Sequence, residues 1–289
     1  MVWLVLFSSV GCSSFQPFQR AKQFSNASKQ WTKGGIEALH QGRLSQAKSL
    51  FSRATIENPA DQTAHINLAR TLQQENDLQP AIKHLQQGLE LSGNRDPKLM
   101  VELGELYLQA GQWLPAKRQA ELVLELDPRF APAWALQGRT NLAKGDLDLA
   151  LADFQRAAGI DHNLPGIQLT IVQTYQRMNQ PLRALSAVEQ LLSQYPPDQQ
   201  PESALIAKSI ALMELKQVSP AIELLQAASE QDDVSSEVYL RLSQAQLFAG
   251  QASQARLTLS RAKLAFPGQT QFDSLLADLH SDAEHVASR

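Results

Sequence analysis

The chain has 289 residues, of which 43% are hydrophobic and 19% charged, and 26 basic against 29 acidic side chains leave a net charge of −3. The apolar content excludes wholesale disorder, and the even charge balance excludes the basic field that non-specific nucleic-acid binding requires. The single cysteine excludes an internal disulfide and any multi-cysteine metal centre.

The N-terminal segment combines a short apolar run, residues 2–7, with the lone Cys12. The run cannot span a bilayer, because a membrane helix needs about 20 apolar residues. The segment resembles the end of a bacterial lipoprotein signal, in which the cysteine becomes the acylated N-terminus, although Ser9 stands where that family usually has Leu. We therefore expect residues 1–12 to be a signal with an anchor cysteine and residues 13–27 to be a tether or an irregular packing segment. The alternative is a frayed apolar terminus with an incidental thiol.

An internal repeat covers most of the remaining chain. A segment of the type AxxxF recurs at intervals of 34, 35, 34, 34, 37 and 34 residues. Its first residues are Ala47, Ala81, Ala116, Ala150, Ala184, Ala221 and Ala255. A period of 34 is typical of tetratricopeptide repeats, and the sequence resembles that family from residue 28 to about 269. The resemblance implies two antiparallel helices in each repeat.

A second column supports this alignment independently of the alanines. When the aligned alanine is numbered position 20 of the repeat, position 15 is Gly or Asn in six of seven repeats. The residues at position 15 are Gly42, Asn76, Gly111, Gly145, Asn179, Lys216 and Gly250. Gly and Asn adopt the left-handed conformation that closes a helix most readily, so we predict that the first helix of each repeat ends here. Position 8 is small in six of seven repeats, which would let the helices approach closely.

These observations predict an all-α fold: a right-handed α-solenoid of about seven tetratricopeptide helix pairs with a C-terminal capping helix. The repeats are predicted at residues 28–61, 62–95, 97–130, 131–164, 165–198, 202–235 and 236–269. In residues 270–289 one helical face collects Phe272, Leu275, Leu276, Leu279, Ala283 and Val286, as expected of a cap. Alternating Val/Ile/Thr-rich runs are missing from the sequence, so we expect no sheet.

Sequence motifs of catalysis are missing from the chain. There is no dinucleotide or phosphate loop, no zinc-protease motif and no nucleophile elbow. The six histidines never pair at the spacings that place two ligands on one helical face. We therefore expect no enzymatic activity, no cofactor, no metal and no small-molecule substrate.

The first helices should line the concave side, where positions 5 and 12 are mainly apolar. This apolar stripe predicts either packing between first helices or a groove for a peptide. Position 9 places Arg70, Glu105 and Arg139 on consecutive first helices about 10 Å apart, and Gln173 follows in the next repeat. The three charges predict either a structural ion-pair ladder or a pair of arginines open to a ligand carboxylate.

Some tetratricopeptide domains bind the C-terminal carboxylate of chaperones with five polar residues from three repeats. This chain matches that pattern at Asn67 and Lys98 but not at Thr32, Ile36 or Glu102. The three mismatches argue against a chaperone tail as the ligand. The peptide-binding hypothesis rests on Asn67, Arg70, Lys98, Glu105, Arg139 and Gln173. Within this set we expect Asn67 and Arg70 to be the most sensitive to ligand.

The sequence as a whole favours a non-enzymatic protein–protein interaction scaffold that is lipid-anchored at the bacterial cell envelope and binds a peptide or partner protein in its concave groove. One alternative is an envelope assembly factor resembling the tetratricopeptide lipoproteins that pilot secretins or act in barrel assembly. Another is the substrate-docking subunit of a separate enzyme. A cytoplasmic location is the alternative to the envelope.

Overall fold

The computed structural model describes the backbone of residues 16–164, 166–231 and 233–277. In these residues every regular element is helical, with fourteen α-helices, one short 3₁₀ helix and no strand. The predicted all-α fold of helix pairs is confirmed. The chain forms two compact units, which we call unit 1 (up to Ala143) and unit 2 (from Lys144) and describe separately.

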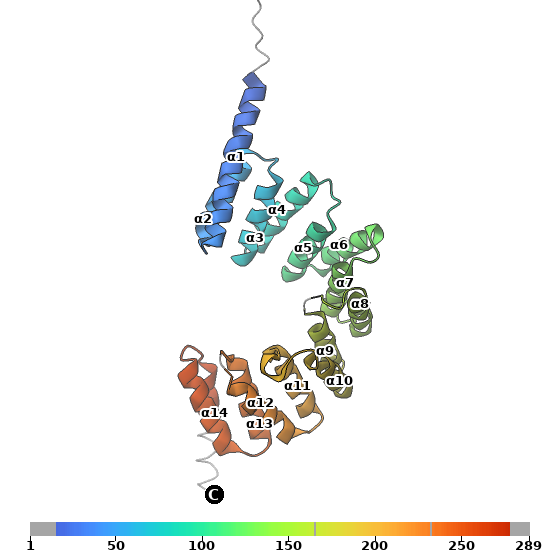
Figure 1. Cartoon of the computed structure of the whole chain (residues 1–289), viewed down its shortest axis with the longest axis vertical. Coiled ribbons are helices and arrows are strands. Elements are labelled where there is room, and N and C mark those ends of the chain that lie inside the picture. Colours follow the sequence, from blue (N-terminus) through green and yellow to red (C-terminus); the bar gives the residue numbers. More distant parts are fainter. Residues whose placement is uncertain (1–15, 165, 232, 278–289) are drawn as a thin grey trace, which may run out of the picture. The chain divides into compact units, whose positions relative to one another are not determined.

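Unit 1 contains three successive helix pairs and the first helix of a fourth (Figure 1). Its helices are α1 (Gln16–His40), α2 (Leu44–Glu57), α3 (Gln62–Gln74), α4 (Leu78–Leu91), α5 (Pro97–Gln109), α6 (Trp113–Leu126) and α7 (Ala131–Lys144). The two helices of each pair pack together, and each pair packs on the next. Helix α1 begins at Gln16, so the backbone of residues 16–27 is helical where we expected a tether or an irregular segment. The reason is local: after Pro17, which suits a first helical turn, the segment has no proline or glycine to stop a helix.

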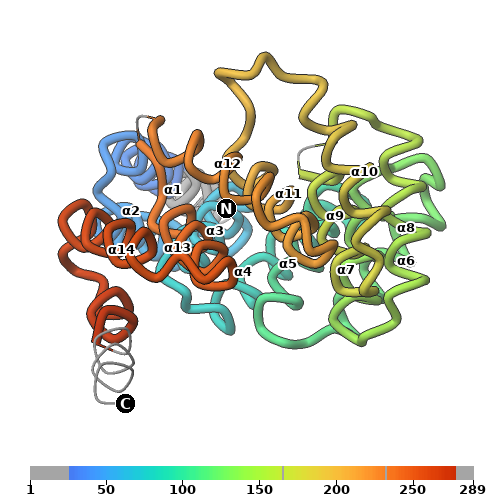
Figure 2. The backbone as a smooth tube through the Cα atoms, turned by 90° about the horizontal axis from the view of Figure 1, so that it is seen from below, coloured from blue at the N-terminus to red at the C-terminus, as the bar shows by residue number. Residues whose placement is uncertain are grey.

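Unit 2 continues with the same alternation. Its helices are α8 (Leu147–Ile160), α9 (Ile167–Arg177), α10 (Pro181–Leu192), the 3₁₀ helix η2 (Pro197–Gln199), α11 (Glu202–Glu214), α12 (Val218–Ser229), α13 (Ser236–Phe248) and α14 (Ala252–Ala265). The 37-residue interval in the sequence repeat corresponds to the α10–α11 connection. Figure 2 shows this connection, which includes η2, standing out from the neighbouring helices of its unit.

The aligned alanines lie where the helices of the repeat come closest. All seven are 0% exposed. Position 8 has the same role at Gly104 of α5, because a β-carbon there would collide with the side chain of Leu136 on α7. At Gly35 of α1 a β-carbon would collide with Phe51 on α2. Small side chains at these two positions therefore permit close packing both within a repeat and between the first helices of successive repeats.

Position 15 ends the first helix in every repeat. All seven residues there have positive φ angles, from 55° at Asn179 to 93° at Gly145. Lys216 adopts the same conformation, with φ 60°, although it carries an ordinary side chain. After Gly111 and after Lys216 the next backbone N–H donates back across the turn, at 2.7 Å to Tyr107 O and at 2.8 Å to Leu212 O. These are the hydrogen bonds of a left-handed helix C-terminus.

The predicted cap is described as far as residue 277. Phe272 is 0% exposed and packs with Leu259 and Ala262 of α14. Leu275 and Leu276 are partly buried against the same cluster. The other predicted cap residues, Leu279, Ala283 and Val286, lie outside the described residues.

Candidate protein-interaction surface

The apolar stripe of the first helices is used for packing. In unit 1, Ile66, Val101 and Leu108 are partly buried against the hydrophobic core. In unit 2, Leu169 and Met213 are likewise partly buried against the hydrophobic core. Of the two alternatives, the structure therefore favours packing between helices over an apolar peptide groove.

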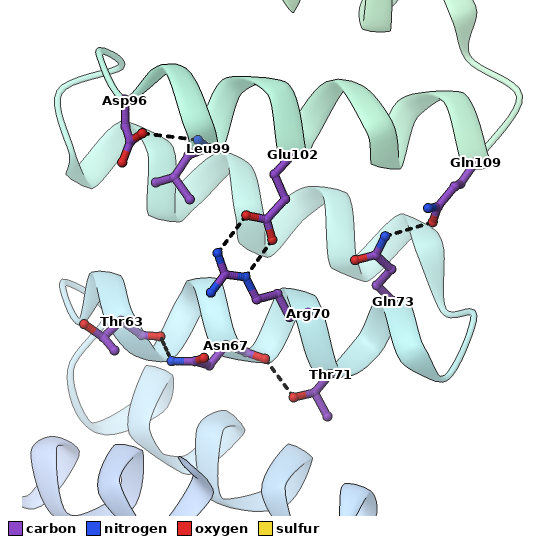
Figure 3. A network of polar contacts seen from close by, with 9 residues as sticks. All are labelled: Thr63, Asn67, Arg70, Thr71, Gln73, Asp96, Leu99, Glu102 and Gln109. Atoms are coloured by element: carbon purple, nitrogen blue, oxygen red, sulfur yellow. Dashed lines mark hydrogen bonds and ion pairs between the residues drawn. The ribbon is translucent and has the colours of Figure 1, made fainter. Parts of the chain in front are cut away.

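Arg70 on α3 is paired with a carboxylate that the sequence did not single out as its partner. Its Nε and Nη2 donate to Glu102 Oε1 and Oε2 of α5 at 2.7 and 2.8 Å, as Figure 3 shows. This hydrogen bond raises the pKa of Arg70 further, against the opposing effect of partial burial. Arg70 therefore links two successive first helices through a bidentate ion pair.

Arg139 on α7 pairs with Glu105 on α5, as the ladder hypothesis expected. Its Nε lies 2.9 and 3.1 Å from the two carboxylate oxygens of Glu105. Glu105 is hydrogen-bonded to Arg139, and Arg70 pairs instead with Glu102, which lies one turn earlier on α5. The sequence predicted two cations around one acid, but the structure has two separate pairs, each of one arginine and one glutamate. The local charge is balanced, and both guanidinium groups are already hydrogen-bonded within the chain.

Asn67 lies on the same side of α3 and is half-buried. Its side-chain Nδ2 donates to Thr63 O at 2.9 Å, and its backbone carbonyl accepts from Thr71 Oγ1 at 2.7 Å (Figure 3). Further along the two helices, Gln73 Nε2 donates to Gln109 Oε1 at 3.0 Å. The Asn67 contacts lie within α3, whereas the Gln73–Gln109 bond joins α3 to α5. The Asn67 side-chain oxygen has no hydrogen-bond donor among the described residues, so it is available to a ligand.

Lys98 at the start of α5 is exposed, and its ammonium group has no partner among the described residues. Its backbone N–H donates to the Asp96 carboxylate, which caps α5, at 2.9 Å. Gln173 is exposed on α9. The structure thus collects five of the six predicted site residues on α3, α5 and α7 of unit 1 and places Gln173 in unit 2.

A groove that the sequence reasoning missed lies between α1 and the start of α3. It has a volume of about 610 Å³, and its wall includes Lys29, Lys33, Glu37 and Thr63. Both lysines are exposed and have no ion-pair partner among the residues that the structure describes. The sequence does contain an indication of this groove, because Lys29 and Lys33 are four residues apart and therefore lie on one face of a helix. They do not occupy position 9, so the comparison of that position between repeats did not include them. We call this cavity the unit 1 groove.

The floor of the unit 1 groove is fixed by one carboxylate. Asp61 accepts the hydroxyls of Ser28 (2.5 Å) and Thr32 (3.1 Å) from α1. It also caps α3 by accepting Ala64 N–H at 3.0 Å. Because its hydrogen-bond donors come from both α1 and α3, Asp61 holds α1 against the start of α3 and so sets the width of the groove.

Two histidines of the second repeat meet under the surface. His65 Nδ1 lies 3.0 Å from His84 Nδ1, and His65 Nε2 lies 3.1 Å from Pro59 O. A carbonyl can only accept, so neutral His65 carries its proton on Nε2 and receives a hydrogen bond from His84 Nδ1–H. Burial lowers the pKa of His65, while Pro59 O and Asp61 oppose that shift. Burial lowers the pKa of His84 as well, and His65 and Lys83 lower it further. This pair joins two helices, so sequence spacing alone does not reveal it.

Unit 2 has a pocket at the corresponding place in its repeats. It has a volume of about 340 Å³ and lies at the start of α9, the α10–α11 connection and the start of α11. Its lining includes Gln168, Tyr195 and Ser203, and no Asp, Glu, Lys or Arg among the described residues. The two cavities therefore differ in chemistry, because lysine and carboxylate side chains line the unit 1 groove, whereas amides, hydroxyls and His162 supply the polar groups of the unit 2 pocket.

In the part of the chain that the structure describes, no group of three or more His, Cys, Asp or Glu side chains is placed to hold a metal ion. None of the helices there has both the length and the apolar character needed to cross a membrane. Cys12, the predicted lipidation site, lies outside the described residues.

Comparisons with known proteins agree on one family. Sequence models of the tetratricopeptide repeat match residues 38–94, 101–165 and 212–279. A tetratricopeptide repeat protein from Parabacteroides merdae is 14% identical, with a TM-score of 0.69 over 88% of this chain and 99% of that one. A thermophilic tetratricopeptide protein of Thermus thermophilus is 25% identical, with a TM-score of 0.51 over 65% of this chain and 100% of that one. MamA from Desulfovibrio magneticus is 17% identical, with a TM-score of 0.52 over 59% and 96%. No curated protein matches the sequence.

Proposed function

Because the chain belongs to the tetratricopeptide repeat family, we propose that it is a non-enzymatic scaffold whose unit 1 groove binds an acidic segment of a partner protein. The fold is one that generally mediates protein–protein interaction. The observation that carries the specific proposal is the pair of groove lysines on α1, Lys29 and Lys33, to which α5 adds the exposed Lys98 outside the groove lining; none of the three has an ion-pair partner among the described residues.

The charges of unit 1 divide into two sets with different roles. Arg70 and Arg139 are engaged with Glu102 and Glu105, so they stabilise the stack of first helices. A ligand carboxylate would have to displace an existing bidentate pair to reach either arginine. The three lysines are exposed and unpaired among the described residues, so a carboxylate can approach them without breaking an ion pair.

Neighbouring polar groups can orient the bound segment. Thr63 is exposed on the groove wall, and the Asn67 side-chain oxygen one turn further along α3 is free to accept from a peptide N–H. Two acids also line the groove: Asp61 on its floor, whose carboxylate is hydrogen-bonded to Ser28 and Thr32, and Glu37 on its wall. The preferred segment therefore carries its acidic residues toward the exposed ammonium groups of Lys29 and Lys33, away from Glu37.

An array of immobilised decapeptides of acidic, neutral and basic composition tests this function. The wild-type chain is expected to bind acidic peptides, and a Lys29→Glu, Lys33→Glu variant is expected to lose at least tenfold in affinity while keeping its helical circular dichroism. Arg261→Glu on α14 of unit 2 is the control for a surface charge reversal, because Arg261 is exposed and has no ion-pair partner among the described residues, and it should bind like wild type. Preference for neutral peptides, or equal binding by the double variant, would contradict the proposal.

The membrane location is a separate part of the proposal and rests on the lipoprotein-like sequence before Cys12. We propose that Cys12 becomes an acylated N-terminus at the cell envelope, which would hold the scaffold near membrane-associated partners. The intact mass of the chain purified from its native host should show loss of residues 1–11 and addition of lipid. A Cys12→Ala variant should retain the uncleaved mass, and a wild-type chain that retains Met1 would contradict lipidation.

A further inference from the structure

Helix α6 carries a concentration of exposed apolar side chains that the groove does not use. Leu114 is 62% exposed, Leu126 is 55%, Leu122 is 38% and Trp113 is 37%. Isolated exposed apolar residues are ordinary, but several on one helix of a soluble protein mark an interaction surface.

The three exposed leucines of α6 lie in one ridge together with Arg118. Leu114, Arg118, Leu122 and Leu126 follow one another at intervals of four residues, and Arg118 is exposed between the leucines. Rows of residues four apart are the ridges by which helices in globular proteins most often pack, crossing at about −50°. The outer side of α6 therefore has the form of a helix-packing surface without a neighbour among the described residues.

The ridge is complementary to itself when one copy is reversed. In an antiparallel pair of α6 helices, Leu114 lies opposite Leu126 of the second copy, and Arg118 lies opposite Leu122. The same arrangement brings Arg118 beside Glu125 of the second copy, one helical turn beyond its opposite residue. Neither Arg118 nor Glu125 has an ion-pair partner among the described residues, whereas Glu121 lies 3.6 Å from Lys117. A dimer with a two-fold axis therefore buries the leucines at both ends of the ridge and pairs Arg118 of each copy with Glu125 of the other.

We propose that α6 is a self-association surface through which two copies of the chain form an antiparallel, two-fold dimer. The inference is independent of the proposed peptide binding, because α6 contributes no residue to the unit 1 groove. Stable interfaces bury about 800 Å² on each partner, and a contact through one helix is smaller, so the dimer is weak and depends on protein concentration.

Sedimentation velocity over a concentration series of the full chain tests the proposal. A Cys12→Ser background under reducing conditions removes disulfide-linked dimers. The chain is expected to shift from monomer to dimer as concentration rises, and Leu114→Asp is expected to weaken association at least tenfold. The matched control is Leu182→Asp, because Leu182 is 70% exposed, lies in unit 2 and has the same position in its repeat as Leu114. A chain that stays monomeric throughout, or a Leu182→Asp variant that dissociates equally, would overturn the proposal.

A charge exchange tests the geometry. Arg118→Glu alone and Glu125→Arg alone should each weaken the dimer, because each places like charges in contact across the axis. The double variant, which carries both changes, should recover at least part of the wild-type association, and so should an equimolar mixture of the two single variants. Failure of both to recover would show that α6 binds something other than a second copy. Far-ultraviolet circular dichroism of each variant verifies that the fold is retained.

Discussion

Units 1 and 2 use the same repeat but connect their first helices by different chemistry. In unit 1, bidentate arginine–carboxylate pairs link α3 to α5 and α5 to α7. In unit 2, Gln176 of α9 donates to Ala207 O of α11 at 2.8 Å, a neutral contact, and the Glu202 carboxylate of α11 accepts Ser235 N–H at the start of α13 at 2.8 Å. The two cavities at corresponding places of the repeats also differ, with lysines in the unit 1 groove and amides and Tyr195 in the unit 2 pocket, although a second cavity of unit 2 has Glu230 and Arg261 in its lining. Buried positions of the repeat therefore set the fold, while exposed positions give each unit its own binding chemistry.

The tryptophans allow the two units to be followed separately. Trp31, Trp113 and Trp134 lie in unit 1, and the fourth, Trp3, precedes the described residues. Unit 2 contains no tryptophan anywhere in its sequence from residue 144 onward. Tryptophan fluorescence therefore reports on unit 1, whereas far-ultraviolet circular dichroism reports on the helices of both units.

The largest expected effect comes from removing one buried aromatic ring in each unit. Phe51 and Phe272 are both 0% exposed, and truncation of a buried Phe to Ala typically costs about 4 kcal/mol. Phe51→Ala should lower the urea midpoint seen by fluorescence. Phe272→Ala should lower the midpoint seen by circular dichroism and leave the fluorescence midpoint in place. An equal shift in both signals for Phe272→Ala would show that the units unfold as one.

Acidification should weaken unit 1 through His65 and His84. Burial holds their folded-state pKa values below the ordinary 6.5, so the unfolded chain binds more protons as the pH falls below about 6.5. Stability is therefore retained at higher pH and is lost as pH falls from about 6.5 toward the folded pKa values. Urea midpoints by fluorescence at pH 7.5 and pH 5.5 measure the loss. The control His162→Gln in unit 2 should keep the wild-type slope, whereas a slope unchanged by His65→Asn, His84→Gln would contradict the assignment.

The turn at position 15 offers substitutions of opposite sign in the two units. Lys216 is exposed at φ 60°, so Lys216→Gly should stabilise unit 2 by about 1 kcal/mol through relief of a strained conformation. Gly111, at φ 73°, should lose about 1 kcal/mol when replaced by Ala. Urea unfolding by circular dichroism for the first variant and by fluorescence for the second measures both. A destabilised Lys216→Gly variant would mean that the lysine side chain makes a contribution larger than the strain.

The contacts between first helices should differ in their response to salt. Glu102→Ala removes an ion pair with a half-exposed arginine and should cost about 1 kcal/mol or less, with a smaller effect at high ionic strength. Gln176→Ala removes a neutral hydrogen bond and should cost about 1 kcal/mol at any ionic strength. Unfolding at low and at high sodium chloride concentration measures both. Equal salt dependence in the two variants would remove the distinction between the units.

The fold was predictable because its determinants recur. The alanines at position 20 and the turn residues at position 15 appear seven times, so even the exception Lys216 is identified by its neighbours in the alignment. The surface was less predictable because its contacts occur once. Arg70 and Glu102 belong to different positions of the repeat, and the choice between Glu102 and Glu105 depends on where Arg139 lies. The His65–His84 contact likewise depends on the packing of α3 on α4, which spacing does not encode.

The helical start of α1 illustrates the same limit. Residues 16–27 lie outside the repeat, so the alignment gave no information on them, and their polar composition suits a tether as well as a helix. Local propensity decided this segment, because it contains no residue that stops a helix after Pro17.

The central claim is that unit 1 recognises acidic segments through its groove while unit 2 does not. Hydrogen exchange of the full chain, with and without a saturating acidic decapeptide, tests it most directly. The account predicts slower exchange in α1 and in the first turns of α3 and α5, with α9 and α11 unchanged. Protection confined to the segments around the unit 2 pocket, residues 166–169 and 194–204, would contradict it.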